Sequence, residues 1–152
     1  MDTAHTVLAI DPGGHTGMAL FREAVLLCSV MTEERSRVFD FLSELSAGAT
    51  IVCEDYVTAQ LMHDGRMTLK LIGAIEREAQ LTRVQFVLQR PQARLPFMAQ
   101  ARALLGKKQP TGRPWTPHHI DAVAHALCYL HKQAPSVPVE SYQTAASLWV
   151  EG

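Results

Sequence analysis

The sequence lacks an apolar run that approaches the roughly 20 residues a membrane-spanning helix requires. Its first residues, MDTAHTVLAI, also lack the basic start and long apolar stretch of a secretory signal. Cysteine is scarce: Cys28, Cys53 and Cys128 are odd in number, widely spaced and each set in an apolar run, which argues against a disulfide framework or a metal cluster. These absences predict a cytoplasmic protein, without membrane contact, whose thiols are reduced and lie in the core.

Internal repeats and low-complexity tracts are lacking too. The chain has 152 residues, of which 47% are hydrophobic and 19% charged, values typical of an ordinary globular protein. This length favours one domain over two. We therefore expect a single domain over residues 1–152, with a weakly structured tail from about residue 134.

Net charge is nearly absent, at −1, which by itself argues against binding to nucleic acid. The average conceals a segregation, because the segment Arg66–Arg113 holds ten basic residues against two acidic ones. Such a segment suits a phosphate backbone, although a solvated helix face remains open as the alternative.

Apolar periodicity and turn residues divide the chain into alternating elements. Strands are expected at Thr6–Ile10, Gly17–Phe21, Ala24–Met31, Ala49–Cys53 and Val84–Leu88. Helices are expected at Glu33–Leu45, Met67–Leu81, Ala93–Leu105 and Pro117–Lys132, with a short one near Thr144–Val150. Tight turns between the first three strands predict an antiparallel meander, whereas the later strands need crossovers and pair in parallel. The expected fold is α/β, a mixed five-stranded sheet flanked by helices.

Two carboxylates occupy positions where burial is expected. Asp11 follows an apolar strand and precedes Pro12 and the glycines 13, 14 and 17, which let a backbone or a phosphate approach closely. Glu54 lies inside what reads as a central strand, where charged residues are rarely buried unless they are paired or bind a metal. An ordinary turn at Asp11 and an ion pair at Glu54 are the structural alternatives. Asp55 points to the opposite face of its strand.

The last predicted helix carries further polar side chains at helical spacing. His118, Asp121 and His125 share one face, while His119 and His131 are expected to face solvent. Carboxylates and imidazoles from two strands and a helix start suit Mg²⁺, and two such ions about 4 Å apart can promote phosphodiester hydrolysis.

Taken in order, Ile10-Asp11-Pro12-Gly13 with Thr16-Gly17, the acidic strand at Glu54, and His118-x-x-Asp121-Ala122 resemble the RuvC-type Holliday-junction resolvases of the RNase H-like superfamily. The resemblance spans about Thr6 to Leu130. The compact chain is also similar to bacteriophage-encoded members of that family. It implies catalytic metal ligands at Asp11, Glu54, His118 and Asp121, and Mg²⁺ or Mn²⁺ as cofactor, with two ions per site. It also implies a homodimer that cuts branched or junction DNA, which contacts Arg66, Lys70, Arg90, Arg94, Lys107, Lys108 and Arg113.

The stretch Tyr56–Arg66 departs from the aromatic-bearing loop usual in that family. Nucleases acting on flaps, replication intermediates or RNA–DNA hybrids, and terminase-type nucleases, stay open because they would share the same metal site. A non-catalytic nucleic-acid-binding module is the alternative of another class. A sugar-kinase or actin-type ATPase is disfavoured, since the spacing of Thr16 and Gly17 is wrong for its phosphate loop and the fold needs two domains.

Overall fold

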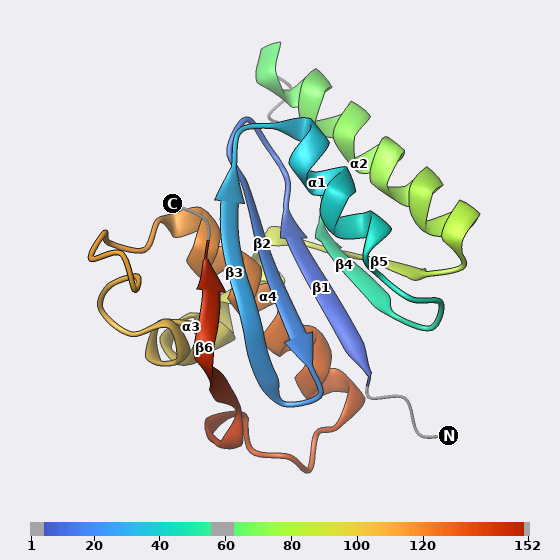
Figure 1. Ribbon diagram of the computed structural model, residues 1–152. Coiled ribbons are helices and arrows are strands. Elements are labelled where there is room, and N and C mark those ends of the chain that lie inside the picture. The colour runs from blue at the N-terminus through green and yellow to red at the C-terminus, as the bar shows by residue number, and fades with distance from the viewer. Residues whose placement is uncertain (1–4, 56–62, 151–152) are drawn as a thin grey trace.

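A six-stranded mixed sheet forms the centre of the protein, with strand order β5-β4-β1-β2-β3-β6. The computed structural model describes residues 5–55 and 63–150; most of the divergent stretch Tyr56–Arg66 lies outside them. Helices α1 (Arg35–Ser43) and α2 (His63–Thr82) cover one face of the sheet, and α4 (Pro117–Gln133) covers the other (Figure 1). The prediction of an α/β fold with helices on a mixed sheet is confirmed.

The first three strands form the expected antiparallel meander. β1 (Thr6–Asp11) pairs with β2 (Thr16–Arg22), which pairs with β3 (Val25–Thr32). β4 (Thr50–Glu54) lies parallel to β1, and β5 (Gln85–Gln89) parallel to β4. Because β1 and β4 run in the same direction, their carboxyl ends meet at one edge of the sheet.

The prediction of a short helix near the end of the chain was wrong. In place of a short helix at Thr144–Val150, residues Gln143–Val150 form strand β6, which lies parallel to β3 and raises the strand number from five to six. The outer edge of β3 offers unpaired N–H and C=O groups, and pairing with them outweighs weak local helix propensity. Thr144 adds a hydrogen bond from its hydroxyl to the Leu104 carbonyl at 2.6 Å.

The predicted helix Ala93–Leu105 is divided by Pro96. Residues Pro91–Phe97 form the 3₁₀ helix η2, and only Met98–Leu105 continue as the α-helix α3. Proline removes a helical N–H donor and crowds the preceding turn, which accounts for the break. A short 3₁₀ turn, η3 (Val139–Ser141), precedes β6. Among the described residues, no helix is long and apolar enough to cross a membrane.

Alternation along the strands divides the core into two layers. Val7, Ala9 and Val52 pack toward α4, whereas Leu8 and Ile10 pack toward α1 and α2. Asp11 and Glu54 have the same parity as Ala9 and Val52, so both project to the face that α4 covers. The sheet alternation thus sets which helix meets the two carboxylates.

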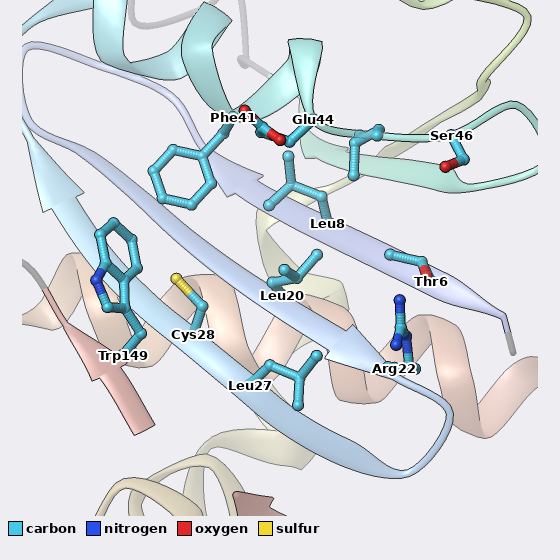
Figure 2. A pocket seen from close by; sticks show the side chains of 11 residues that line it. Thr6, Leu8, Leu20, Arg22, Leu27, Cys28, Phe41, Glu44, Ser46 and Trp149 are labelled. Atoms are coloured by element: carbon cyan, nitrogen blue, oxygen red, sulfur yellow. The ribbon is translucent and has the colours of Figure 1, made fainter. Parts of the chain in front are cut away.

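The other face holds an apolar cavity of about 380 Å³ between the sheet and α1. Figure 2 shows Leu8, Leu20 and Cys28 rising from the strands toward Phe41, with Trp149 of β6 at one end. The rings of Phe41 and Trp149 are 5.4 Å apart. All three cysteines are free and buried, as predicted, and burial raises the pKa of each thiol.

Candidate active site

Two carboxylates meet at the ends of neighbouring parallel strands. Asp11 is the last residue of β1 and Glu54 the last of β4, and the register that pairs Ile10 with Cys53 brings them side by side. Asp11 is buried and Glu54 half-buried.

The two carboxyl groups differ in their affinity for protons. Burial, the hydrogen bond to Glu54, and the charges of Glu54 and Asp121 hold the pKa of Asp11 well above its usual range, with Arg94 opposing. Burial acts to raise the pKa of Glu54 as well, but hydrogen bonds from His125 and Asp11 outweigh it and the pKa is lowered. A divalent cation bound between the two carboxyl groups would offset the cost of burying their negative charge.

The start of α4 lies over this pair. Thr116 caps the helix by accepting from the His119 N–H at 3.4 Å, and Pro117 occupies the first helical position. His118 then lies with its Nδ1 3.4 Å from an Asp11 carboxylate oxygen. Gly17, paired with Asp11 in the sheet, leaves room for this approach, since a Cβ there would stand 2.0 Å from the His118 carbonyl oxygen. The predicted role of this glycine in close backbone approach is confirmed.

His125 is a site residue whose membership the sequence left open. Its ring is fully buried, with Nε2 3.1 Å from a Glu54 oxygen and Nδ1 2.8 Å from Oε1 of Gln89. The imidazole therefore fixes the orientation of the Glu54 carboxylate, much as outer partners orient metal ligands. Helical spacing from Asp121 signalled His125, but Gln89 carries no signal in the sequence, because its role depends on β5 lying beside β4.

Asp121 is held by an arginine. The Nε of Arg94, from η2, donates to Oδ1 of Asp121 at 3.0 Å, and another guanidinium nitrogen donates to the Pro91 carbonyl. The two side chains are 25% and 18% exposed. Arg94 was expected to contact DNA; here its guanidinium lies in the candidate site, since η2 packs against α4.

As they stand, the described residues form no group of three or more His, Cys, Asp or Glu side chains that could hold a metal ion. Asp11 and Glu54 end neighbouring parallel strands and fit one cation, with the Nδ1 of His118 3.4 Å from Asp11. Asp121 does not join them, because its carboxylate forms an ion pair with Arg94. The donor chemistry thus suits Mg²⁺ or Mn²⁺, and completing the set requires Asp121 to change partners.

A cavity of about 610 Å³ opens beside Asp11 and His118, lined also by the loop 12–16 and by Met67 of α2. In this loop His15 stacks on His118, with ring centroids 5.5 Å apart, and lies 3.1 Å from Glu33. The cavity therefore lies on the solvent side of Asp11, at the edge of the sheet.

Two further histidines differ from prediction. His119 is buried, since its Nδ1 lies 2.8 Å from the Thr116 hydroxyl and its ring packs edge-on against Trp115. Burial first, and then the charge of His118, lower the pKa of His119 to about 4. His131 is half-buried against Phe97. The predicted solvent exposure of both was wrong, because neighbours from other elements cover them.

The remaining predicted DNA contacts all lie at the surface. Two are on α2, one immediately before η2, and three on the loop that leads into α4: Arg66, Lys70, Arg90, Lys107, Lys108 and Arg113. The loop is tied by a bridge between Lys108 and Pro114 and by the Gln109 N–H donating to the Arg113 carbonyl at 2.8 Å.

A meander followed by parallel strands, with helices on both faces, defines the RNase H-like fold, and the protein has this fold. Two similar solved structures are RuvC proteins of Thermus thermophilus. RuvC in complex with a Holliday-junction substrate matches with a TM-score of 0.66 and 19% identity, over 85% of this chain and 95% of that one. A second Thermus thermophilus RuvC structure matches with a TM-score of 0.58 and 21% identity, over 86% and 96%. No protein-family model and no curated protein matches the sequence. The predicted resemblance is confirmed for the fold.

Proposed function

We propose that the protein is a Mg²⁺-dependent endonuclease that cuts branched DNA, with the Holliday junction as substrate. One observation carries the proposal: on a RuvC-like fold, the buried Asp11 and the half-buried Glu54 meet at the sheet edge where α4 presents His118 and Asp121. Buried acids from separate elements serve no packing purpose, and their mutual repulsion costs stability unless a cation compensates.

In this proposal Asp11, Glu54, His118 and Asp121 hold two Mg²⁺ or Mn²⁺ ions. Bound there, the ions would activate water and stabilise the leaving oxygen of a phosphodiester. The protein's own part is positional. His125 fixes Glu54 through a 3.1 Å hydrogen bond, and the Thr116 cap fixes the first turn of α4. The cavity beside Asp11 admits the scissile backbone.

DNA binding is assigned to the exposed cations. Lys107, Lys108 and Arg113 lie on the loop that enters α4 and that leads to His118, and Arg66 and Lys70 lie on α2. Lysine and arginine that replace counterions on phosphates give an affinity that falls steeply with salt.

We further propose a homodimer formed through α2, so that two sites can cut opposed strands. Leu69 is 36% exposed on this helix, and Gly73, four residues on and therefore on the same face, leaves open space beside it. An exposed apolar side chain beside a glycine lets a second backbone approach closely. Light scattering after size exclusion should report a dimer, which Leu69→Glu should convert to a monomer. A wild-type monomer at micromolar concentration contradicts this proposal.

The deciding experiment is a cleavage panel of four-way junction, flap, linear duplex, single-stranded DNA and RNA–DNA hybrid, with and without Mg²⁺ or Mn²⁺. We expect cation-dependent cuts in the junction, abolished by Asp11→Asn and by Glu54→Gln while DNA binding persists. Asp40→Asn, on the exposed side of α1, is the matched control. Preferential cutting of flaps or hybrids would support the proposed metal site but contradict the Holliday junction as the substrate.

A non-catalytic nucleic-acid-binding module is the second candidate. The ion pair between Arg94 and Asp121 favours it, because it neutralises one of the acids without a metal. Junction binding without cleavage of any substrate in the panel, in either cation, is the result this candidate requires.

A further inference from the structure

The guanidinium of Arg94 stands where its positive charge acts on every carboxylate of the candidate site. It touches Asp121 directly, at 3.0 Å from Nε to Oδ1, and its charge also opposes protonation of Asp11 and Glu54. Its side chain is only 25% exposed. An arginine this close to three acids is a strong internal counter-ion, because partial burial weakens solvent screening.

Arg94 is supplied by a segment outside the sheet and outside α4. It lies on η2, a 3₁₀ helix that contains Pro96, and its second contact is to the Pro91 carbonyl in the same helix. Arginine has a long side chain, so the head can leave Asp121 without movement of the carboxylates. Arg90, four residues earlier and exposed, lacks contact with Asp121 and gives a matched comparison.

A divalent cation bound to Asp121 would lie about 2.0–2.1 Å from its ligand oxygen for Mg²⁺. The cation and the guanidinium would then share one carboxylate in a half-buried place, at a separation where like charges repel strongly. A freed guanidinium is also a good ligand for phosphate, which it can bind through two N–H groups.

We propose that Arg94 is a positioning residue that competes with the divalent cation for Asp121, and that cation binding releases its guanidinium to a phosphate of the bound DNA. The inference rests on the proposed metal site. Arg94 thereby couples the two events: it neutralises the acids before the cation arrives and strengthens DNA binding afterwards.

The test measures Mn²⁺ affinity by calorimetry and by the electron paramagnetic resonance of free Mn²⁺, without DNA. Arg94→Gln, and Arg94→Met as a second uncharged variant that keeps the packing of the aliphatic stem, should lower the Mn²⁺ dissociation constant about tenfold or more. Arg94→Lys, which keeps the charge, should have a Mn²⁺ dissociation constant nearer to that of wild type. Arg90→Gln should have the same Mn²⁺ dissociation constant as wild type. Unchanged or weaker Mn²⁺ binding in both uncharged variants overturns the inference, as does a lysine variant that binds as tightly as they do.

A second readout compares the affinity for junction DNA in Ca²⁺ with the affinity in EDTA. Every protein in this comparison keeps the native Asp11, Glu54, His118 and Asp121. Wild type should bind junction DNA more tightly in Ca²⁺ than in EDTA. The increase should be at least severalfold smaller in the uncharged Arg94 variants. An equal gain contradicts the release of the guanidinium to phosphate. If neither wild type nor any Arg94 variant binds Mn²⁺, the metal site of the proposed function fails as well; if wild type binds and the variants match it, only the role of Arg94 fails.

Discussion

Replacing Gly17 with alanine tests how the sheet and α4 are fitted together. A Cβ at residue 17 would lie 2.0 Å from the His118 carbonyl oxygen, 2.6 Å from its carbonyl carbon and 3.2 Å from its Cβ. Cβ contacts in proteins essentially never fall below 3.0 Å, so β2 and the start of α4 would have to separate by 3.0 − 2.0, about 1 Å. The contacted atoms belong to the main chain, which no rotamer change can move.

The cost has a structural part and a functional part. Overpacking a close-packed interior costs about 1–3 kcal/mol, and the rigid neighbour places Gly17→Ala at the upper end. For a chain of this size that is a fall in melting temperature of about 6–12 °C. A shift of about 1 Å also moves His118 and Asp121 away from Asp11 and Glu54, and a misplacement of this size can reduce catalysis about 100-fold.

Thermal unfolding monitored by circular dichroism, with Mn²⁺-dependent junction cleavage on the same samples, measures both parts. Gly14→Ala is the matched control in the adjoining loop, because a Cβ there meets nothing within 4 Å. We expect Gly14→Ala to melt with wild type. A Gly17→Ala variant with wild-type melting temperature and activity would refute the packing on which the site depends.

Three further predictions concern the acids and the cations. The pKa of Asp11 is raised from 3.8 to about 9, so the unfolded chain loses this proton at a lower pH than the folded protein does. Without metal, the protein therefore loses stability as pH rises from about 4 to 9. In EDTA, Asp11→Asn should melt at a higher temperature than wild type, by a margin that widens from pH 5 to pH 8. His125→Ala leaves Glu54 without its imidazole and opens a cavity, and should cost about 2–4 kcal/mol in denaturant unfolding together with a higher Mn²⁺ dissociation constant. Replacing Lys107 and Lys108 with alanine should weaken junction binding and reduce the slope of log affinity against log salt by about 2.

Each of these has a result that contradicts it. A margin for Asp11→Asn that is constant with pH would mean that Asp11 titrates normally in the folded protein. A His125→Ala protein with unaltered Mn²⁺ affinity would leave the histidine a packing residue only. A salt slope equal to that of wild type would remove the Lys107–Lys108 loop from the DNA interface.

Much of the site was predictable because its residues sit at positions that local pattern marks. A carboxylate that directly follows four apolar residues, as Asp11 does, lies at the buried end of a strand whatever the rest of the fold. Thr116-Pro117 marks a helix start, and helical spacing then places His118 and Asp121 on one face. The strand and helix order followed from the same periodicities.

Contacts between elements distant in the chain were not predictable from those patterns. Strand β6 exists because β3 offers an unpaired edge, not because residues 143–150 have a strong strand preference. His119 is buried because Trp115 and the Thr116 cap enclose it. Gln89 reaches His125 only because β5 lies beside β4.

The sequence by itself determined that Asp11 and Glu54 each follow an apolar strand, and that His118 and Asp121 lie in the first turns of a helix. Those are consequences of residue type and spacing, which act within a few residues. Tertiary structure alone decided that burial and the nearby Glu54 raise the pKa of Asp11, that Gly17 admits the His118 backbone, and that Arg94 neutralises Asp121. Burial, proton affinity and counter-ion choice depend on the distances between separate elements, and packing fixes those distances.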